Sequence, residues 1–212
     1  MPLPNSLSEE NIRAHCPHCD PASDAFRDLL KETDQFRIVC DVHPIIEGHS
    51  LIIPKKHVSC VGEYDDALFQ EFSDHYDAVS AFVRKHYGSV STFEHGKIGQ
   101  SVFHSHVHIL PFKGEPTAIV PEGLEHCTPL SKIEDLRSLY LRQGQYLFFS
   151  IENRKWTVDT ALAAPRFFRD RFAAALGRPE RGDWKEMHVN TELMAAGKTE
   201  NTRMKSLWIS HY

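Results

Sequence analysis

The sequence has little of several features that would place it in a special class of protein. Its net charge is only -5 and its pI is near 6.3, so it lacks the basic excess of proteins that bind long nucleic acids or anionic membranes. No apolar run approaches the roughly 20 residues of a membrane helix. The first 20 residues also lack the basic and apolar segments of a secretory signal. We therefore expect a cytoplasmic protein with neither a membrane nor a long nucleic acid as partner.

Cysteine is scarce and odd in number, with five residues in the chain. Without a secretory signal, this number argues against a disulfide framework. Cys16 and Cys19 form a C-x-x-C pair, whose thiolates suit zinc when two imidazoles complete the site. A redox pair is the alternative, although the motif does not lie between a clear strand and a long helix. The adjacent His15 and His18 are candidate ligands or surface residues.

The 212 residues, 41% of them hydrophobic, are enough for a substantial core. Apolar periodicity predicts helices over residues 23–32, 65–87, 133–141 and 164–176, and strands over residues 35–41, 50–54, 89–94, 101–110 and 145–151. This order predicts an α+β fold with a helix packed on an antiparallel sheet. Glycines and prolines interrupt the pattern after residue 113. We expect a first domain over residues 1–113, a linker over 114–129, and a smaller α/β extension over 130–212.

Three histidines alternate in the stretch QSVFHSHVHILP, namely His104, His106 and His108. In a strand they would share one face, spaced roughly 6.5 to 7 Å apart. A solvated strand face is the plain interpretation, but three imidazoles in register between apolar residues favour a function. Two possibilities follow: a three-histidine metal site, or one nucleophilic histidine whose neighbours have other tasks.

The stretch H-S-H-V-H-I-L resembles the signature of the histidine triad (HIT) family, His-φ-His-φ-His-φ-φ with φ apolar. Residues 99–103 and the block from Asp41 to His57 are similar to further family motifs, and the resemblance covers about residues 16–111. Two positions depart from it. Ser105 replaces an apolar residue, so we expect the opposite face of this strand to be less dry or to meet a polar group. Glu94-His95 stands where many relatives carry a phosphate-binding asparagine. His95 could substitute for that asparagine, but we expect it to be a solvated loop residue.

The resemblance implies an antiparallel sheet with a packed helix, a homodimer, and chemistry at the α-phosphorus of a nucleotide. His106 would be the nucleophile, and His108 would hydrogen-bond the phosphate or bridging oxygen. His49 would line the active site, and either His49 or His108 would protonate the leaving group. The positions that match substrate-binding residues are Asp41 for the ribose hydroxyls, and Gln100 and Ser101 for the phosphate oxygens and leaving group.

The resemblance also implies a metal site with four ligands: Cys16, Cys19, His57 and His104. Such a closed site makes Zn2+ structural instead of catalytic. It would fix the first histidine of the row and help to hold the register of the second.

We therefore predict a nucleotide hydrolase or nucleotidyltransferase that forms a covalent nucleotidyl-histidine. Its substrate would be a nucleoside phosphate derivative such as a dinucleoside polyphosphate, a phosphoramidate or a nucleotide sugar. One alternative is a nucleotide- or protein-binding module on a HIT scaffold with little turnover. Another is a three-histidine metalloenzyme, which leaves Cys16, Cys19, His49 and His57 without a role. A basic cluster in the extension could hold distal phosphates or an acidic leaving group; it comprises Arg166, Arg169, Arg171, Arg178 and Arg181.

Overall fold

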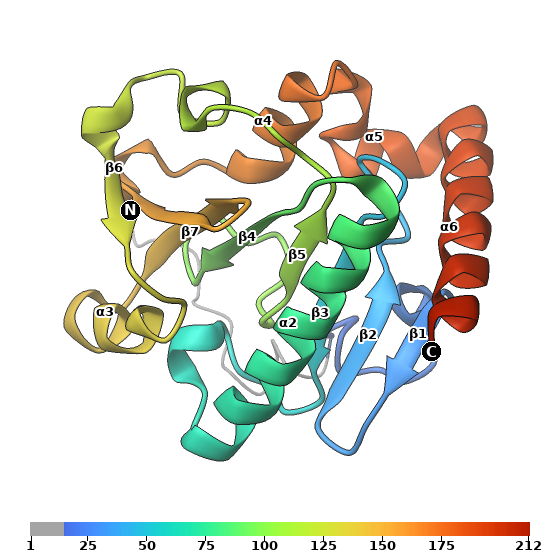
Figure 1. Ribbon diagram of the computed structural model, residues 1–212, viewed down its shortest axis with the longest axis horizontal. Coiled ribbons are helices and arrows are strands. Elements are labelled where there is room, and N and C mark those ends of the chain that lie inside the picture. The colour runs from blue at the N-terminus through green and yellow to red at the C-terminus, as the bar shows by residue number, and fades with distance from the viewer. Residues whose placement is uncertain (1–14) are drawn as a thin grey trace, which may run out of the picture.

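The computed structural model describes residues 15–212, and within this range eight strands form one sheet (Figure 1). Their order across the sheet is β1-β2-β3-β5-β4-β7-β8-β6, and neighbouring strands pair antiparallel. The predicted α+β class, with an antiparallel sheet and a packed helix, is confirmed. The strands are β1 (Leu29–Glu32), β2 (Phe36–Cys40), β3 (Ser50–Pro54), β4 (Ser91–Gly96), β5 (Val107–Leu110), β6 (Cys127–Leu130), β7 (Tyr146–Ile151) and β8 (Arg154–Val158).

Helix α2 crosses one face of the sheet (Figure 1). The Asp65 side chain caps its start by accepting the Leu68 N–H, and Gly88 ends it with a φ of 82°, a left-handed conformation that glycine adopts without strain. Its apolar stripe, which includes Phe72 and Phe82, packs on Val107 and Ile109 of β5. The α-helices are α2 (Asp66–Tyr87), α3 (Asp135–Gln143), α4 (Phe167–Ala175), α5 (Trp184–Val189) and α6 (Thr191–His211). Short 3-10 helices are Asp24–Phe26, Val61–Glu63, Pro116–Ala118, Leu124–His126, Thr160–Leu162 and Pro179–Arg181.

Helix α4 covers the opposite face of the sheet. Its Phe168 and Phe172 pack on Phe93 of β4, and Phe168 also contacts Phe149 of β7. Helix α6 packs against β2 and α2. The ring of Trp208 contacts that of Phe82, with centroids 4.8 Å apart. The C-terminal segments therefore extend and cover the same sheet that carries the histidine motif.

Two predicted elements of the N-terminal half are wrong in part. Of the helix expected over residues 23–32, only the turn Asp24–Phe26 forms, capped by the Ser23 hydroxyl, and the remainder becomes edge strand β1. Leu29 there packs with Val39, so pairing with β2 overrides the local helical pattern. The strand expected over residues 101–110 is regular only from Val107. Its earlier residues bond elsewhere: the Ser105 N–H donates to the Val58 carbonyl.

The extension holds more structure than the sequence indicated. The predicted helices near α3 and α4 and the strand β7 are present, whereas β6, β8, α5 and α6 were not predicted. β6 begins at Cys127, inside the predicted linker, and β7 pairs with β4 over six residue pairs. One sheet therefore runs through both halves of the chain. The division into residues 1–113, 114–129 and 130–212 stays a prediction. Across residues 15–212, no helix is long and apolar enough to cross a membrane.

Candidate active site and metal centre

A cleft lies at the histidine motif, and it draws residues from both halves of the chain. His106 and His108 line it together with the segment after β2 and the N-terminal loop. The extension contributes Arg166 and Arg169 from the start of α4, and Trp184 and His188 from α5. The cleft is thus built by segments that lie far apart in the sequence.

The His106 ring is fixed in one tautomer. Its Nδ1–H donates to the carbonyl oxygen of His104 at 2.6 Å, so Nε2 keeps its lone pair. Burial lowers the pKa of His106, which favours the neutral imidazole. A neutral imidazole with a free Nε2 at a cleft is the form that can attack an electrophile.

His49 and His108 form a second ordered pair. The Ile45 N–H donates to Nδ1 of His49 at 3.1 Å, so the proton of this ring lies on Nε2, which donates to Nδ1 of His108 at 2.9 Å. The proton of neutral His108 is then on Nε2. His108 also stacks on Phe93, with centroids 4.1 Å apart. Burial lowers the pKa of His49 to about 4 and that of His108 well below its ordinary value, so both rings are neutral near pH 7.

The Asp41 carboxylate lies behind this pair. It accepts the His43 N–H at 2.9 Å and pairs with the Arg169 guanidinium at 2.7 Å. Burial alone would raise the pKa of Asp41, but the Arg169 charge and these contacts hold it near 2. Asp41 lines the cleft, as expected of a ribose-binding position, yet much of its carboxylate is already engaged.

The two predicted phosphate-binding residues differ in placement. Ser101 is exposed and lines the cleft beside Gly99. The Gln100 side chain instead donates its amide N–H to the Ser59 carbonyl at 2.6 Å, while its buried Oε1 has no hydrogen-bond partner within the described part of the chain. The structure therefore places Ser101 at the cleft and fixes Gln100 beside it.

The expectation for His95 is wrong. It lies in β4, is buried, lines the cleft, and accepts the Phe168 N–H through Nε2 at 3.4 Å. Burial lowers its pKa to about 3. The sequence offered one signal for this placement: His95 is two residues after the apolar Phe93, so in a strand the two side chains share a face. The polar partner expected for Ser105 is present, since the Ser105 hydroxyl donates to the buried Glu94 carboxylate at 3.0 Å.

His18 is a cleft residue that sequence reasoning left open. It is buried, and its ring packs edge-on against His106 with centroids 5.1 Å apart. Its Nδ1 has no hydrogen-bond partner among residues 15–212. Of the arginine cluster, Arg166 and Arg169 reach the cleft, whereas Arg171 pairs with Glu122 instead. Arg178 and Arg181 both pair with Glu200.

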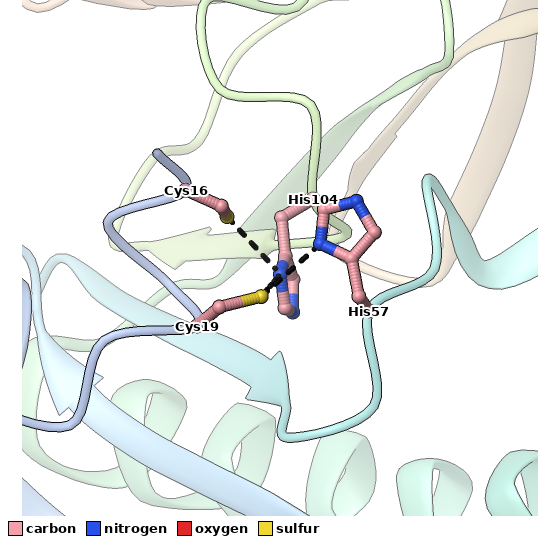
Figure 2. A group of neighbouring side chains, drawn as sticks. All are labelled: Cys16, Cys19, His57 and His104. Carbon is pink, nitrogen blue, oxygen red and sulfur yellow. Dashed lines mark hydrogen bonds between the residues drawn. The ribbon is translucent and has the colours of Figure 1, made fainter. Parts of the chain in front are cut away.

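The four predicted metal ligands meet beside the cleft, with all four ligand atoms within 4.8 Å of one another (Figure 2). Nδ1 of His104 lies 3.4 Å from both Cys16 Sγ and Cys19 Sγ, and Nδ1 of His57 lies 3.1 Å from Cys19 Sγ. Tetrahedral zinc, with bonds of about 2.3 Å to sulfur and 2.0 Å to nitrogen, places such atoms about 3.5 Å apart. Nε2 of His104 donates to the Pro54 carbonyl at 2.7 Å, which directs Nδ1 to the cluster. The donor set and spacing fit zinc.

The histidine row does not form one metal site. Only His104 joins the cysteines, while His106 is turned to a backbone carbonyl. Asp41, His49 and His108 have ligand atoms close enough for an ion, but the Arg169 guanidinium already neutralises the carboxylate. In addition, Nδ1 of His49 already accepts a backbone N–H. A further cation there would face like charge and occupied lone pairs.

Known proteins with similar sequences share one domain with this chain. The model of the HIT domain matches residues 24–115. "Protein hit" of Bacillus subtilis is 33% identical over 103 residues, which cover 47% of this chain and 70% of that protein. "Adenylylsulfatase HINT3" of Arabidopsis thaliana is 32% identical over 108 residues, which cover 49% of this chain and 55% of that protein.

Solved structures align with the chain over part of its length. A zinc-bound histidine triad family protein from Mycobacterium smegmatis is 23% identical and has a TM-score of 0.41. The aligned part covers 48% of this chain and 78% of that protein. A HIT family member from Bacillus subtilis is 22% identical and has a TM-score of 0.42. The aligned part covers 61% of this chain and 95% of that protein. Because 33% identity extends over 70% of the first relative, the chain belongs to the HIT family.

Proposed function

We propose that the protein is a nucleotide hydrolase or nucleotidyltransferase that acts at the α-phosphate of a nucleoside phosphate derivative through a covalent nucleotidyl-His106. The single observation that carries the proposal is the 2.6 Å hydrogen bond from His106 Nδ1–H to the His104 carbonyl, which leaves Nε2 as the nucleophilic atom at a cleft. Family membership supports a nucleotide as the ligand.

In the first step, Nε2 of His106 forms a bond to the α-phosphorus while the bond from phosphorus to the leaving group breaks. The leaving group takes the bonding pair, together with a proton where its basicity demands one. In the second step, water or another acceptor forms a bond to the phosphorus while the bond from phosphorus to Nε2 of His106 breaks, and the attacking group gives up a proton. The product is the nucleoside monophosphate when water attacks, and the nucleotidylated acceptor otherwise. Covalent catalysis thus divides one difficult displacement into two easier ones.

We assign the proton-donating role to His108. It lines the cleft with its proton on Nε2, whereas His49 is fully buried and already donates to His108. The Nε2–H of His108 would hydrogen-bond a phosphate oxygen or the bridging oxygen, where charge develops in the transition state. Ser101 and Asp41 line the cleft, where Ser101 would hold phosphate oxygens and Asp41 would meet the ribose.

We propose that Cys16, Cys19, His57 and His104 hold a structural Zn2+. The four protein ligands leave no open position, so the ion would supply a rigid cross-link between the N-terminal loop and the histidine segment. His104 would then be held at Nδ1 by the ion and at Nε2 by Pro54, and its carbonyl is the acceptor that orients His106.

Intact-mass analysis after brief incubation with candidate substrates tests the proposal. The set comprises a dinucleoside polyphosphate, adenosine phosphoramidate, a nucleotide sugar and adenylyl sulfate, the last suggested by the name of the plant relative. We expect an added nucleotidyl mass in the wild type and in His126→Ala, a histidine outside the cleft, but none in His106→Ala. Nucleotide binding without adduct or turnover in the wild type would instead support a binding module.

A further inference from the structure

Arg169 of α4 reaches across the molecule to the segment after β2. Its Nη1–H donates to Asp41 Oδ2 at 2.7 Å, and its Nη2–H donates to the His43 carbonyl at 2.7 Å. Weaker contacts of 3.4 Å run from Nη2 to the Arg181 carbonyl and from Nε to the Gly182 carbonyl. Both charged groups are buried, so this guanidinium is a fixed part of the cleft wall.

The carboxylate held by Arg169 lies close to two imidazoles. Asp41 Oδ2 is 3.6 Å from Nδ1 of His49 and 3.8 Å from Nδ1 of His108. Neither nitrogen carries a proton in the ordered arrangement, because the Ile45 N–H and His49 Nε2–H donate to them. An uncompensated carboxylate at this range would favour a proton on one of these nitrogens.

Either protonation would break the order of the pair. A proton on Nδ1 of His49 would face the Ile45 N–H, and a proton on Nδ1 of His108 would face the Nε2–H of His49. Two donors would then point at each other in a buried site, and the rings would have to move. The remaining charged or titratable groups around the pair are Arg169 of α4, His95 of β4, and His106 before β5.

We propose that Arg169 is a positioning residue: by pairing with Asp41 it keeps the negative charge of that carboxylate from favouring an extra proton on the His49–His108 pair, and so preserves the Nε2–H that His108 presents to substrate. The reaction part of this inference rests on the function proposed above. The extension then contributes to the chemistry by setting the charge behind the catalytic pair, in addition to walling the cleft.

The test compares Arg169→Gln with Arg171→Gln in the full chain. Arg171 lies on the same helix, but it pairs with Glu122 and does not line the cleft. Histidine side-chain 15N NMR at pH 7 reads the proton positions, and intact mass reads the rate of adduct formation. In Arg169→Gln we expect an imidazolium signal from His49 or His108 and a roughly 100-fold slower adduct, the scale of losing one preorganised donor. Arg171→Gln should match the wild type in both.

Two further variants separate charge from folding. Arg169→Lys restores a positive charge and should return the neutral pattern. The double variant Arg169→Gln/Asp41→Asn removes both charges and should also return it, whatever its effect on substrate binding. If Arg169→Gln does not fold, a loss of the neutral pattern in Arg169→Met and its return in Arg169→Met/Asp41→Asn would support the inference.

An unchanged histidine spectrum in Arg169→Gln, or equal rate losses in Arg169→Gln and Arg171→Gln, would overturn the inference. These results are distinct from failure of the proposed function, in which the wild type forms no adduct at all. In that case the NMR comparison still decides whether Arg169 controls the proton positions.

Discussion

The carbonyl oxygen of His104 accepts the Nδ1–H of His106 at 2.6 Å, while the His104 ring takes part in the cysteine–histidine cluster. One residue therefore belongs to both groups, with its side chain in the cysteine–histidine cluster and its backbone carbonyl bonded to the His106 ring. Because the orientation of His106 depends on where this carbonyl lies, the proposed metal centre would be mechanically linked to the proposed chemistry.

Cys16→Ser is expected to abolish zinc binding and to weaken the fold. A hydroxyl is a poor substitute for a thiolate ligand, and loss of a structural site removes folding free energy. A loss on the order of 3 kcal/mol would lower the melting temperature by about 10 °C in a chain of this size. Metal analysis and thermal unfolding check this, with Cys127→Ser, a half-buried cysteine outside the cluster, as control.

Cys16→Ser should also slow adduct formation at temperatures where it is folded, because Nδ1 of His104 is no longer held by the metal ion. Wild-type metal content in Cys16→Ser would refute the ligand set. Zinc loss with an unchanged rate would show that the Pro54 contact alone holds His104.

Replacement of His49 should separate proton order from packing. The side-chain amide of Gln can place an N–H near the position of Nε2, so His49→Gln can still donate to Nδ1 of His108, whereas His49→Leu cannot. Both variants lose the acceptor of the Ile45 N–H. We expect His49→Leu to form the adduct roughly 100-fold more slowly than the wild type, and His49→Gln to stay within about tenfold.

Equal rates of adduct formation in the two His49 variants would count against the role of the His49 Nε2–H in keeping the His108 proton on Nε2. Melting temperatures measured alongside would show whether both have lost the same packing, in which case the difference in rate belongs to the donor.

The elements with strong local patterns were predictable, and those that depend on distant pairing were not. The stripe of α2 repeats over six turns and has an N-cap at Asp65, so its bounds agree within one residue. The segment that becomes β1 has a helical pattern, and only its pairing with β2 decides otherwise. Helix α6 has few apolar residues at helical spacing. Its buried positions include Glu200, which pairs with Arg181, and Asn201, which donates to the Asp41 carbonyl 160 residues away.

The candidate site shows the same division. The alternating histidines and the C-x-x-C pair lie in local motifs, and the residues they suggested do meet in space. Arg169, by contrast, is 128 residues from Asp41, and no spacing rule connects them. Trp184 and His188 reach the cleft on a short helix that the sequence did not indicate. The homodimer and the cytoplasmic location stay predictions.

Glu94 should make stability depend on pH. It is buried and accepts hydrogen bonds from Val61 N–H, the Ser105 hydroxyl and the Tyr146 hydroxyl, and burial raises its pKa from 4.5 to about 7. Between these values the folded protein holds a proton that the unfolded chain has released. Its contribution to stability is therefore complete below pH 4.5 and is lost as the pH rises through 7, by on the order of 3 kcal/mol.

Buried histidines act in the opposite sense in this window, since their lowered pKa values make stability rise with pH up to about 6.5. The informative quantity is thus the difference between the wild type and Glu94→Gln in free energy of unfolding, measured from pH 4.5 to 8. We expect this difference to fall with pH for Glu94→Gln and to stay flat for Glu125→Gln, an exposed control. A flat difference for Glu94→Gln would mean that Glu94 is ionised in the folded protein throughout.

Trp184→Ala should weaken nucleotide binding without unfolding the protein. The indole is half-buried in the cleft wall, with its ring 5.7 Å from that of His43, so it offers a flat face to a planar group of the ligand. Stacking of a base on an aromatic side chain contributes about 1 to 3 kcal/mol, which corresponds to a roughly 5- to 150-fold change in dissociation constant.

Calorimetric titration of His106→Ala/Trp184→Ala with a nucleoside monophosphate, the hydrolysis product, measures this dissociation constant. His106→Ala/Glu186→Ala is the control, because Glu186 is exposed on the same helix. Equal affinities in the two double variants would exclude a stacking role. A lower melting temperature of Trp184→Ala than of the wild type would instead assign the indole to packing.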